Sequence, residues 1–188
     1  MYYYQRDLPH WHPAGASIFL TWRLHGTLAP HRPDLAHRDP ARAFLTYDRA
    51  LDNAVSGPTW LWDPDIARCV VDALRSGQLH LALYKLAAFC LMPNHVHAVI
   101  QPRAPVSRIT ESIKRYTTLE ANLILGRGGE QFWQDESDDH WIRNEAEWNR
   151  IIHYTELNPV AAGLVEAAEQ WPWSSASVSQ FNCNPSRI

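Results

Sequence analysis

Cysteine, lysine and long apolar runs are all scarce in this chain of 188 residues. Its three cysteines show no paired spacing, which excludes a disulfide scaffold and favours a reduced, cytoplasmic setting. No apolar run approaches the length of a membrane span, and the first residues lack the pattern of a signal peptide, so we expect no membrane association. Hydrophobic residues make up 46% of the chain and charged residues 20%, a balance that excludes disorder and suits one folded domain over residues 1–188.

The net charge of −3 gives no sign of a nucleic-acid partner, but the charge is unevenly distributed. Residues 103–127 carry five basic and two acidic residues, a balance of +3, whereas residues 130–169 carry ten acidic and two basic residues, a balance of −8. Of the 17 basic residues, all but two are arginine, whose planar fork suits phosphate oxygens. A GC-rich genome would produce the same excess of arginine, so the sequence leaves both explanations open.

Apolar periodicity and turn signals predict strands and helices in mixed order. The expected strands cover residues 15–28, 79–91 and 95–101, with one short strand within 132–143. The expected helices cover residues 40–56, 64–76, 106–125 and 145–157, with a short final helix after Ala161. Asp63 can cap the second helix, Gly77 follows its end, and Pro93-Asn94 forms a tight turn between two antiparallel strands. We therefore predict an α+β fold, a sheet with helices on one face.

Two histidines stand one residue apart in the apolar stretch CLMPNHVHAVIQP, residues 90–102. Positions i and i+2 of a strand face the same side, so His95 and His97 would project together. Two adjacent imidazoles can ligate one divalent metal ion. The alternative is a pair of partly exposed histidines on a solvent face, but the apolar surroundings and the preceding turn favour a metal site.

A third ligand and a nucleophile could come from the phrase HYTELNPV. Tyr154 and Asn158 are four residues apart and share one face of the predicted helix. Beside a metal ion they would supply a nucleophile and an amide ligand. The alternative, a core aromatic and a helix-end residue, is favoured when only these residues are considered. Tyr116 is a rival nucleophile, with Glu120 one turn later as its metal ligand.

Several phrases resemble one protein family and occur in the same order as in that family. They are LPHWHPAGASIFLTWRLHG, MPNHVH, FWQDESDDHWIRN, HYTELNPVAAGLV and WPWSS. Together they resemble the REP-associated tyrosine transposases of the HUH single-tyrosine superfamily, from about Leu8 to Ser175. The resemblance implies a ferredoxin-like antiparallel sheet with helices packed on one face. It also implies a single-stranded or hairpin DNA partner, and relatives include both monomers and homodimers.

The resemblance also assigns roles to residues. It makes His95, His97 and Asn158 the ligands of Mg²⁺ or Mn²⁺, and Tyr154 the nucleophile. The implied reaction is metal-dependent cleavage and rejoining of palindromic hairpin DNA through a 5′-phosphotyrosine. This chain departs from the family pattern at Asp138, where an aromatic residue is common, and mildly after the tyrosine.

The basic segment offers the best candidates for holding the DNA backbone. Arg108, Lys114 and Arg115 lie at its centre, although a solvated helix face would carry the same residues. Trp11, Trp22, Trp133 and Trp141 could stack unpaired bases, but none is assigned that role. Two other functions remain open: a catalytically silent protein that binds hairpin DNA, and a metal-dependent hydrolase that uses water as its nucleophile.

Overall fold

The computed structural model describes residues 2–5, 9–13, 15–27 and 57–177, and the helix predicted over residues 40–56 lies outside them. The main sheet has four strands, β3 (Ser17–Arg23), β4 (Tyr84–Leu91), β5 (His95–Pro102) and β6 (Asp138–Ile142). The main helices are α2 (Pro64–Leu79), α3 (Val106–Leu125) and α4 (Glu145–Ala161). Smaller elements are the strands β1 (Tyr2–Gln5) and β2 (Pro9–His12) and the 3-10 turns η1 (Trp60–Trp62) and η2 (Ala168–Gln170).

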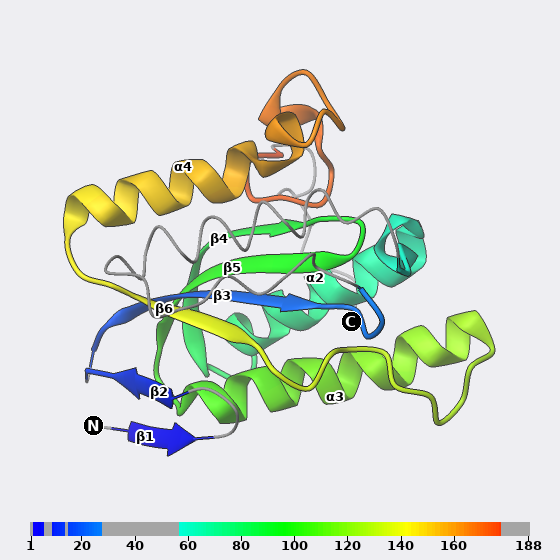
Figure 1. Cartoon of the computed structure of the whole chain (residues 1–188), viewed down its shortest axis with the longest axis horizontal. Helices are drawn as coiled ribbons and strands as arrows, with labels where there is room; N and C mark the ends of the chain where they lie inside the picture. Colours follow the sequence, from blue (N-terminus) through cyan, green and yellow to red (C-terminus); the bar gives the residue numbers. More distant parts are fainter. Residues whose placement is uncertain (1, 6–8, 14, 28–56, 178–188) are drawn as a thin grey trace.

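The topology of the main sheet is that of a ferredoxin-like fold. Along the chain the elements run β3-α2-β4-β5-α3-β6, and the sheet order is β4-β5-β3-β6 with every neighbouring pair antiparallel. The strand β3 therefore lies inside the sheet, between β5 and β6 (Figure 1). The predicted α+β class and ferredoxin-like antiparallel sheet are confirmed. No helix in the described ranges is long and apolar enough to cross a membrane.

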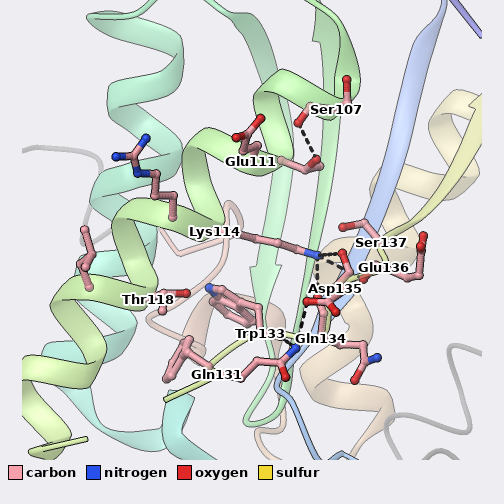
Figure 2. A pocket seen from close by; sticks show the side chains of 14 residues that line it. Ser107, Glu111, Lys114, Thr118, Gln131, Trp133, Gln134, Asp135, Glu136 and Ser137 are labelled. Atoms are coloured by element: carbon pink, nitrogen blue, oxygen red, sulfur yellow. Dashed lines mark hydrogen bonds between the residues drawn. The ribbon is translucent and has the colours of Figure 1, made fainter. Parts of the chain in front are cut away.

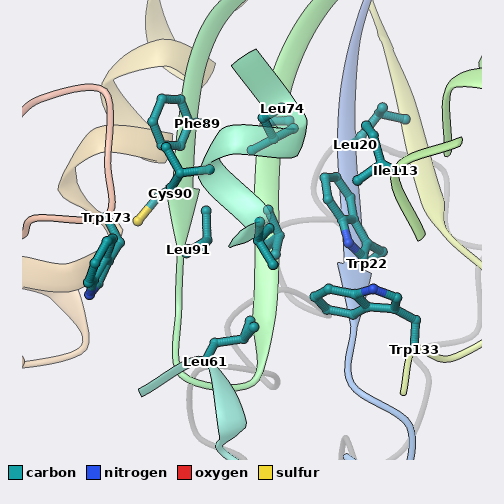
Figure 3. Packing of buried hydrophobic residues seen from close by; sticks show 14 of the residues in the cluster. Leu20, Trp22, Leu61, Leu74, Phe89, Cys90, Leu91, Ile113, Trp133 and Trp173 are labelled. Atoms are coloured by element: carbon teal, nitrogen blue, oxygen red, sulfur yellow. The ribbon is translucent and has the colours of Figure 1, made fainter. Parts of the chain in front are cut away.

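Helices cover both faces of this sheet. The helices α2 and α3 pack on one face over a large apolar cluster that includes Leu20, Trp22, Leu74 and Ile113 (Figure 3). The helix α4 packs on the other face, as Figure 1 also shows.

The prediction that helices pack on one face is therefore right for α2 and α3 and wrong for α4. The reason lies in β3, whose five central residues, Ile18 to Trp22, are all buried. Their side chains alternate between the two faces, so both faces are apolar and both need a cover. Phe19 and Val99 on the second face pack against Ile151 of α4.

The start of α2 follows the sequence prediction, but its end does not. Asp63 Oδ1 accepts a hydrogen bond from the backbone N–H of Asp65 at 2.9 Å, as expected of an N-cap. The helix continues through Gly77 to Leu79 rather than ending before it. Glycine is required here by packing, because a Cβ at position 77 would lie 2.3 Å from the hydroxyl oxygen of Tyr84.

Gly77→Ala is expected to destabilise the fold, although alanine is the better helix former. Tyr84 is fully buried, and its hydroxyl donates a hydrogen bond to the Leu74 carbonyl at 2.7 Å. The ring therefore cannot move aside without losing packing and this hydrogen bond. We expect a loss of about 1–3 kcal/mol in the free energy of unfolding, the usual cost of overpacking. Urea denaturation of Gly77→Ala, with and without Tyr84→Phe, checks this. An equal loss in both backgrounds would contradict the proposed clash with the hydroxyl.

The helix α4 is longer than predicted, and this places Asn158 inside it. The sequence suggested an end near Asn158-Pro159, yet the helix runs to Ala161 with Pro159 in its last turn. Pro159 cannot donate to the carbonyl one turn back and its ring crowds that carbonyl, and the helix ends two residues later at Ala161. Tyr154 and Asn158 therefore lie on one continuous helix, one turn apart.

Residues 173–175, from the phrase WPWSS, extend the sheet along β4. The N–H of Leu91 donates to the Trp173 carbonyl and the N–H of Ser175 donates to the Phe89 carbonyl, both at 2.9 Å. The Ser175 hydroxyl also donates to the Glu156 carboxylate of α4 at 2.9 Å. This segment therefore joins the outer strand of the sheet to the helix that carries Tyr154.

Candidate active site

The two histidines of β5 lie side by side on the face of the sheet covered by α4. Both imidazoles are fully buried, and their Nε2 atoms are 2.9 Å apart. Their shared face follows from strand geometry, since Val96 between them packs in the cluster on the opposite face.

The Nδ1 atom of each imidazole lies within hydrogen-bond distance of a neighbouring polar side chain. His95 Nδ1 lies 2.6 Å from Asn94 Oδ1, and His97 Nδ1 lies 3.0 Å from the Thr21 hydroxyl. An amide oxygen only accepts hydrogen bonds, so Nδ1 of His95 donates to Asn94 Oδ1, and Nε2 of the neutral ring presents a lone pair. Supporting bonds of this kind orient metal-binding histidines in proteins.

The protonation state of His97 also suits a metal ligand. Burial, and secondly the neighbouring His95, hold the pKa of His97 well below its usual range. The imidazole is therefore neutral at neutral pH, the form that donates a lone pair to a metal ion.

The helix α4 brings the remaining two predicted residues to the same place. Asn158 is buried, and its side-chain nitrogen lies 3.1 Å from His97 Nε2. The half-buried ring of Tyr154 packs edge-on against His97, with ring centroids 6.1 Å apart. The structure thus assembles His95, His97, Tyr154 and Asn158, which are separated by up to 63 positions in the chain.

One buried polar atom in this cluster lacks a partner. Within the described part of the chain, Asn158 Oδ1 is buried without a hydrogen bond. Such an atom is costly, and a bound cation would satisfy it. Two imidazole nitrogens and one amide oxygen form a donor set that fits a divalent metal ion. No group of three His, Cys, Asp or Glu residues with metal-binding geometry occurs among the described residues, so the amide is the third donor that this site offers.

The start of α4 is fixed by a polar cluster that the sequence did not reveal. Asn144 caps the helix by accepting from the Glu147 N–H at 2.9 Å. One Glu147 oxygen lies 2.9 Å from His140 Nε2, and the other accepts from the Arg143 N–H at 2.8 Å. Burial raises the pKa of Glu147, but the hydrogen bonds from Arg143 and His140 outweigh it and leave the pKa below its usual range. This cluster fixes the first turn of the helix that carries Tyr154 about two to three turns further along.

We expect the Glu147 carboxylate to make the stability of the protein depend on pH. Because its pKa is lowered on folding, its contribution is complete above the pKa of the unfolded chain and is lost as pH falls through the folded pKa. Glu147→Gln should cost about 2 kcal/mol near neutral pH, and the difference from wild type should shrink in acid. Chemical denaturation from pH 7 to pH 3 measures this. Exposed Glu145→Gln is the matched control, and a constant difference across the range would contradict the assignment.

Lys114, one of the three predicted DNA contacts, is engaged within the protein. Its ammonium group donates to the carbonyls of Gln134, Asp135 and Glu136, at 2.8, 3.1 and 3.1 Å (Figure 2). An ammonium group has three hydrogens, so these bonds use all of them. Lys114 thus holds the loop that leads into β6, on the wall of a pocket of about 470 Å³.

The other predicted residues of α3 lie apart from the histidine pair. Arg108 and Arg115 are exposed on α3, and this helix packs on the sheet face opposite α4. The rival nucleophile Tyr116 lies on α3 as well and is 51% exposed. The structure therefore brings Tyr154, and not Tyr116, to the histidines.

The structure also shows where Asp138 and two of the candidate stacking tryptophans lie. Asp138 pairs in register with Thr21, which pairs with His97, so all three share one face of the sheet. Two of the candidate stacking tryptophans, Trp22 and Trp133, are buried and pack on each other in the core.

The fold and the site define a class of protein: a ferredoxin-like sheet with a His-x-His pair on an inner strand, faced by a tyrosine and an amide from one helix. Comparisons with known proteins then point to one family. The chain is 27% identical over 105 residues to a putative REP-associated tyrosine transposase of Haemophilus influenzae, a match that covers 49% of this chain and 58% of the relative. It is 24% identical over 93 residues to a REP-associated tyrosine transposase of Escherichia coli K12, covering 49% and 54%.

A solved structure shares the fold across most of the chain. It is described as a REP-associated tyrosine transposase bound to a REP hairpin, with a TM-score of 0.57 and 17% sequence identity, over 90% of this chain and 82% of that one. The resemblance seen in the sequence is thus confirmed, although the chain spans little more than half the length of the curated relatives that it matches. No family model matches the chain.

Proposed function

We propose that this protein is a single-tyrosine transposase of the REP-associated type, which cleaves and rejoins hairpin-forming single-stranded DNA. The proposal rests on one observation above all: the Tyr154 ring and the Asn158 amide both lie against His97, whose Nε2 is 2.9 Å from that of His95, and the Asn158 oxygen is buried without a hydrogen bond among the described residues. A core aromatic residue and a helix-end residue would have no reason to lie beside a buried pair of histidines. The similarity to curated transposases gives independent support.

In the proposed reaction Tyr154 acts as a nucleophile. Its phenolic oxygen attacks a phosphodiester, loses its proton, and forms a 5′-phosphotyrosine while the 3′-oxygen leaves as a hydroxyl. Attack by a 3′-hydroxyl on this link restores a phosphodiester and frees the tyrosine. The covalent link conserves the energy of the original bond, so the reaction needs no ATP. The packing of Tyr154 against His97 and Phe19 fixes its ring and limits the directions from which a phosphate can be attacked.

His95, His97 and Asn158 would hold a divalent metal ion in this protein. Manganese tolerates imidazole ligands better than magnesium does, whereas cellular abundance favours magnesium. A bound metal ion would supply positive charge that polarises the phosphate. The contacts with Asn94 and Thr21 hold the two rings so that their Nε2 atoms face each other, where they would be available to a metal ion.

The proposed DNA partner is supported by the similarity in fold to a solved structure. The transposase of similar fold is bound to a REP hairpin, and we propose a hairpin substrate for this chain too. Arg108 and Arg115 are exposed on one helix and can bind backbone phosphates at a distance from the cleaved bond. Lys114 would act indirectly, by holding the loop before β6.

A denaturing gel distinguishes this function from its alternatives. The protein is incubated with an end-labelled DNA hairpin that carries single-stranded flanks, in the presence of Mn²⁺, and is then denatured. A labelled protein–DNA adduct is the expected result. Hairpin binding without an adduct would instead indicate a catalytically silent binding protein, and cut DNA without an adduct would indicate a hydrolase that uses water.

A further inference from the structure

We propose that Arg23 binds the phosphate that is cut and neutralises the charge that builds up on it during attack. This proposal rests on the proposed function and adds a residue to its site.

Strand register places Arg23 beside the histidine pair. In the β3–β5 ladder Arg23 lies opposite His95, and Thr21 lies opposite His97. The Thr21 hydroxyl is hydrogen-bonded to His97, so these side chains occupy the same face of the sheet. Arg23 is two residues beyond Thr21 and shares that face, while Trp22 between them packs in the opposite cluster. Cβ atoms of directly opposed residues are about 5 Å apart, well within the length of an arginine side chain.

The guanidinium of Arg23 is held in place but not neutralised. Its Nη1 donates to the Thr27 carbonyl at 2.6 Å, which anchors one arm of the group. In the described part of the chain it has no other hydrogen bond and no ion pair. A half-buried cation without a counter-ion is costly, and an anionic ligand would offset that cost. The remaining N–H groups form the planar fork that suits phosphate oxygens.

No other arginine in the described part of the chain is paired in register with the histidine strand on this face. Arg108 and Arg115 belong to α3, behind the opposite face. Arg23 therefore combines three properties: a position on the strand beside β5, a fixed side chain, and donors left for a ligand. A cationic fork aimed at a reacting phosphate stabilises the negative charge of the transition state and takes no part in proton transfer.

Single-turnover kinetics test this role. The rate of adduct formation is measured for wild type, Arg23→Ala, Arg23→Lys and the exposed control Arg68→Ala, on a hairpin with a normal scissile phosphate and on one with a neutral methylphosphonate there. On the normal phosphate we expect Arg23→Ala to be slowed by about a hundredfold and Arg23→Lys by less, with Arg68→Ala unchanged. On the methylphosphonate the gap between wild type and Arg23→Ala should shrink towards one, because the charge that Arg23 neutralises has been removed.

Equilibrium binding and thermal melting accompany the kinetics. We expect hairpin affinity to change less than threefold, since one phosphate contact among many is lost. An equal defect on both substrates would show that Arg23 only supports the fold, and a wild-type rate for Arg23→Ala would also overturn the proposal. Either result would leave the proposed function intact, because wild type would still form the adduct. If wild type forms none, both proposals fall. Should Arg23→Ala not fold, the same comparison of substrates is made with Arg23→Lys.

Discussion

Tyr154→Phe is expected to abolish the covalent protein–DNA adduct, with a loss of at least about a thousandfold in the rate of strand cutting. Phenylalanine keeps the ring that packs against Phe19 and His97, so the fold and the hairpin affinity should be preserved. Only the attacking oxygen is removed. The measurement is the fraction of labelled DNA bound to denatured protein over time, with melting temperature and hairpin affinity recorded for the same sample.

Tyr116→Phe is the matched control for this result. It removes a phenolic oxygen from an exposed tyrosine on α3, a helix on the opposite side of the sheet from the histidines. We expect adduct formation at the wild-type rate. If Tyr116→Phe lost the adduct while Tyr154→Phe kept it, the assignment of the nucleophile would be wrong.

The second large effect concerns the metal ion. At Mn²⁺ concentrations about a hundredfold above the dissociation constant, binding should stabilise the native protein by about 2.7 kcal/mol. For a chain of this size that corresponds to a rise of about 5–10 °C in melting temperature. His97→Ala should lose this rise and also the adduct, because His97 lies between His95 and Asn158 and contacts both. Chelation of divalent ions should reduce wild type to the same level of cutting.

Three variants make the metal experiment specific. Asn158→Asp keeps oxygen donors at this position and should retain the Mn²⁺-dependent rise, whereas Asn158→Ala should weaken it. His153→Ala removes an exposed histidine from α4, next to Tyr154 in sequence, and should behave as wild type. A full Mn²⁺ response in His97→Ala would show that the metal ion binds at another site.

Sequence patterns predicted those parts of the structure that depend on local geometry. The alternation of a strand was enough to place His95 and His97 on one face, and helical periodicity gave the bounds of α3 as they are observed. The four-residue spacing of Tyr154 and Asn158 was enough to put them on one helix face. These inferences need only the repeat of one element.

The remaining parts depend on packing between elements that are distant in sequence. A charged segment predicted Lys114 as a DNA contact, yet only the folded chain brings three carbonyls of residues 134–136 to its ammonium group. The place of Arg23 beside His95 depends on strand register, which the sequence alone does not give. Gly77 could not be distinguished from a helix stop, because the side chain that requires it, Tyr84, belongs to another element. The sequence motif was enough to predict the site residues, whereas the contacts of Lys114, Arg23 and Gly77 depend on how distant elements pack.

The pairing of residues 173–175 with β4 has a practical consequence for any shortened form of this protein. An unpaired outer strand exposes a row of N–H and C=O groups that recruits strands from other molecules. Cutting the chain before Trp171 would uncover that row and would also remove the Ser175 hydroxyl that fastens Glu156. Such a truncation should favour self-association in solution and give the C-terminal half of α4, the helix that carries Tyr154, more freedom, so a shortened form should retain the chain through Ser175.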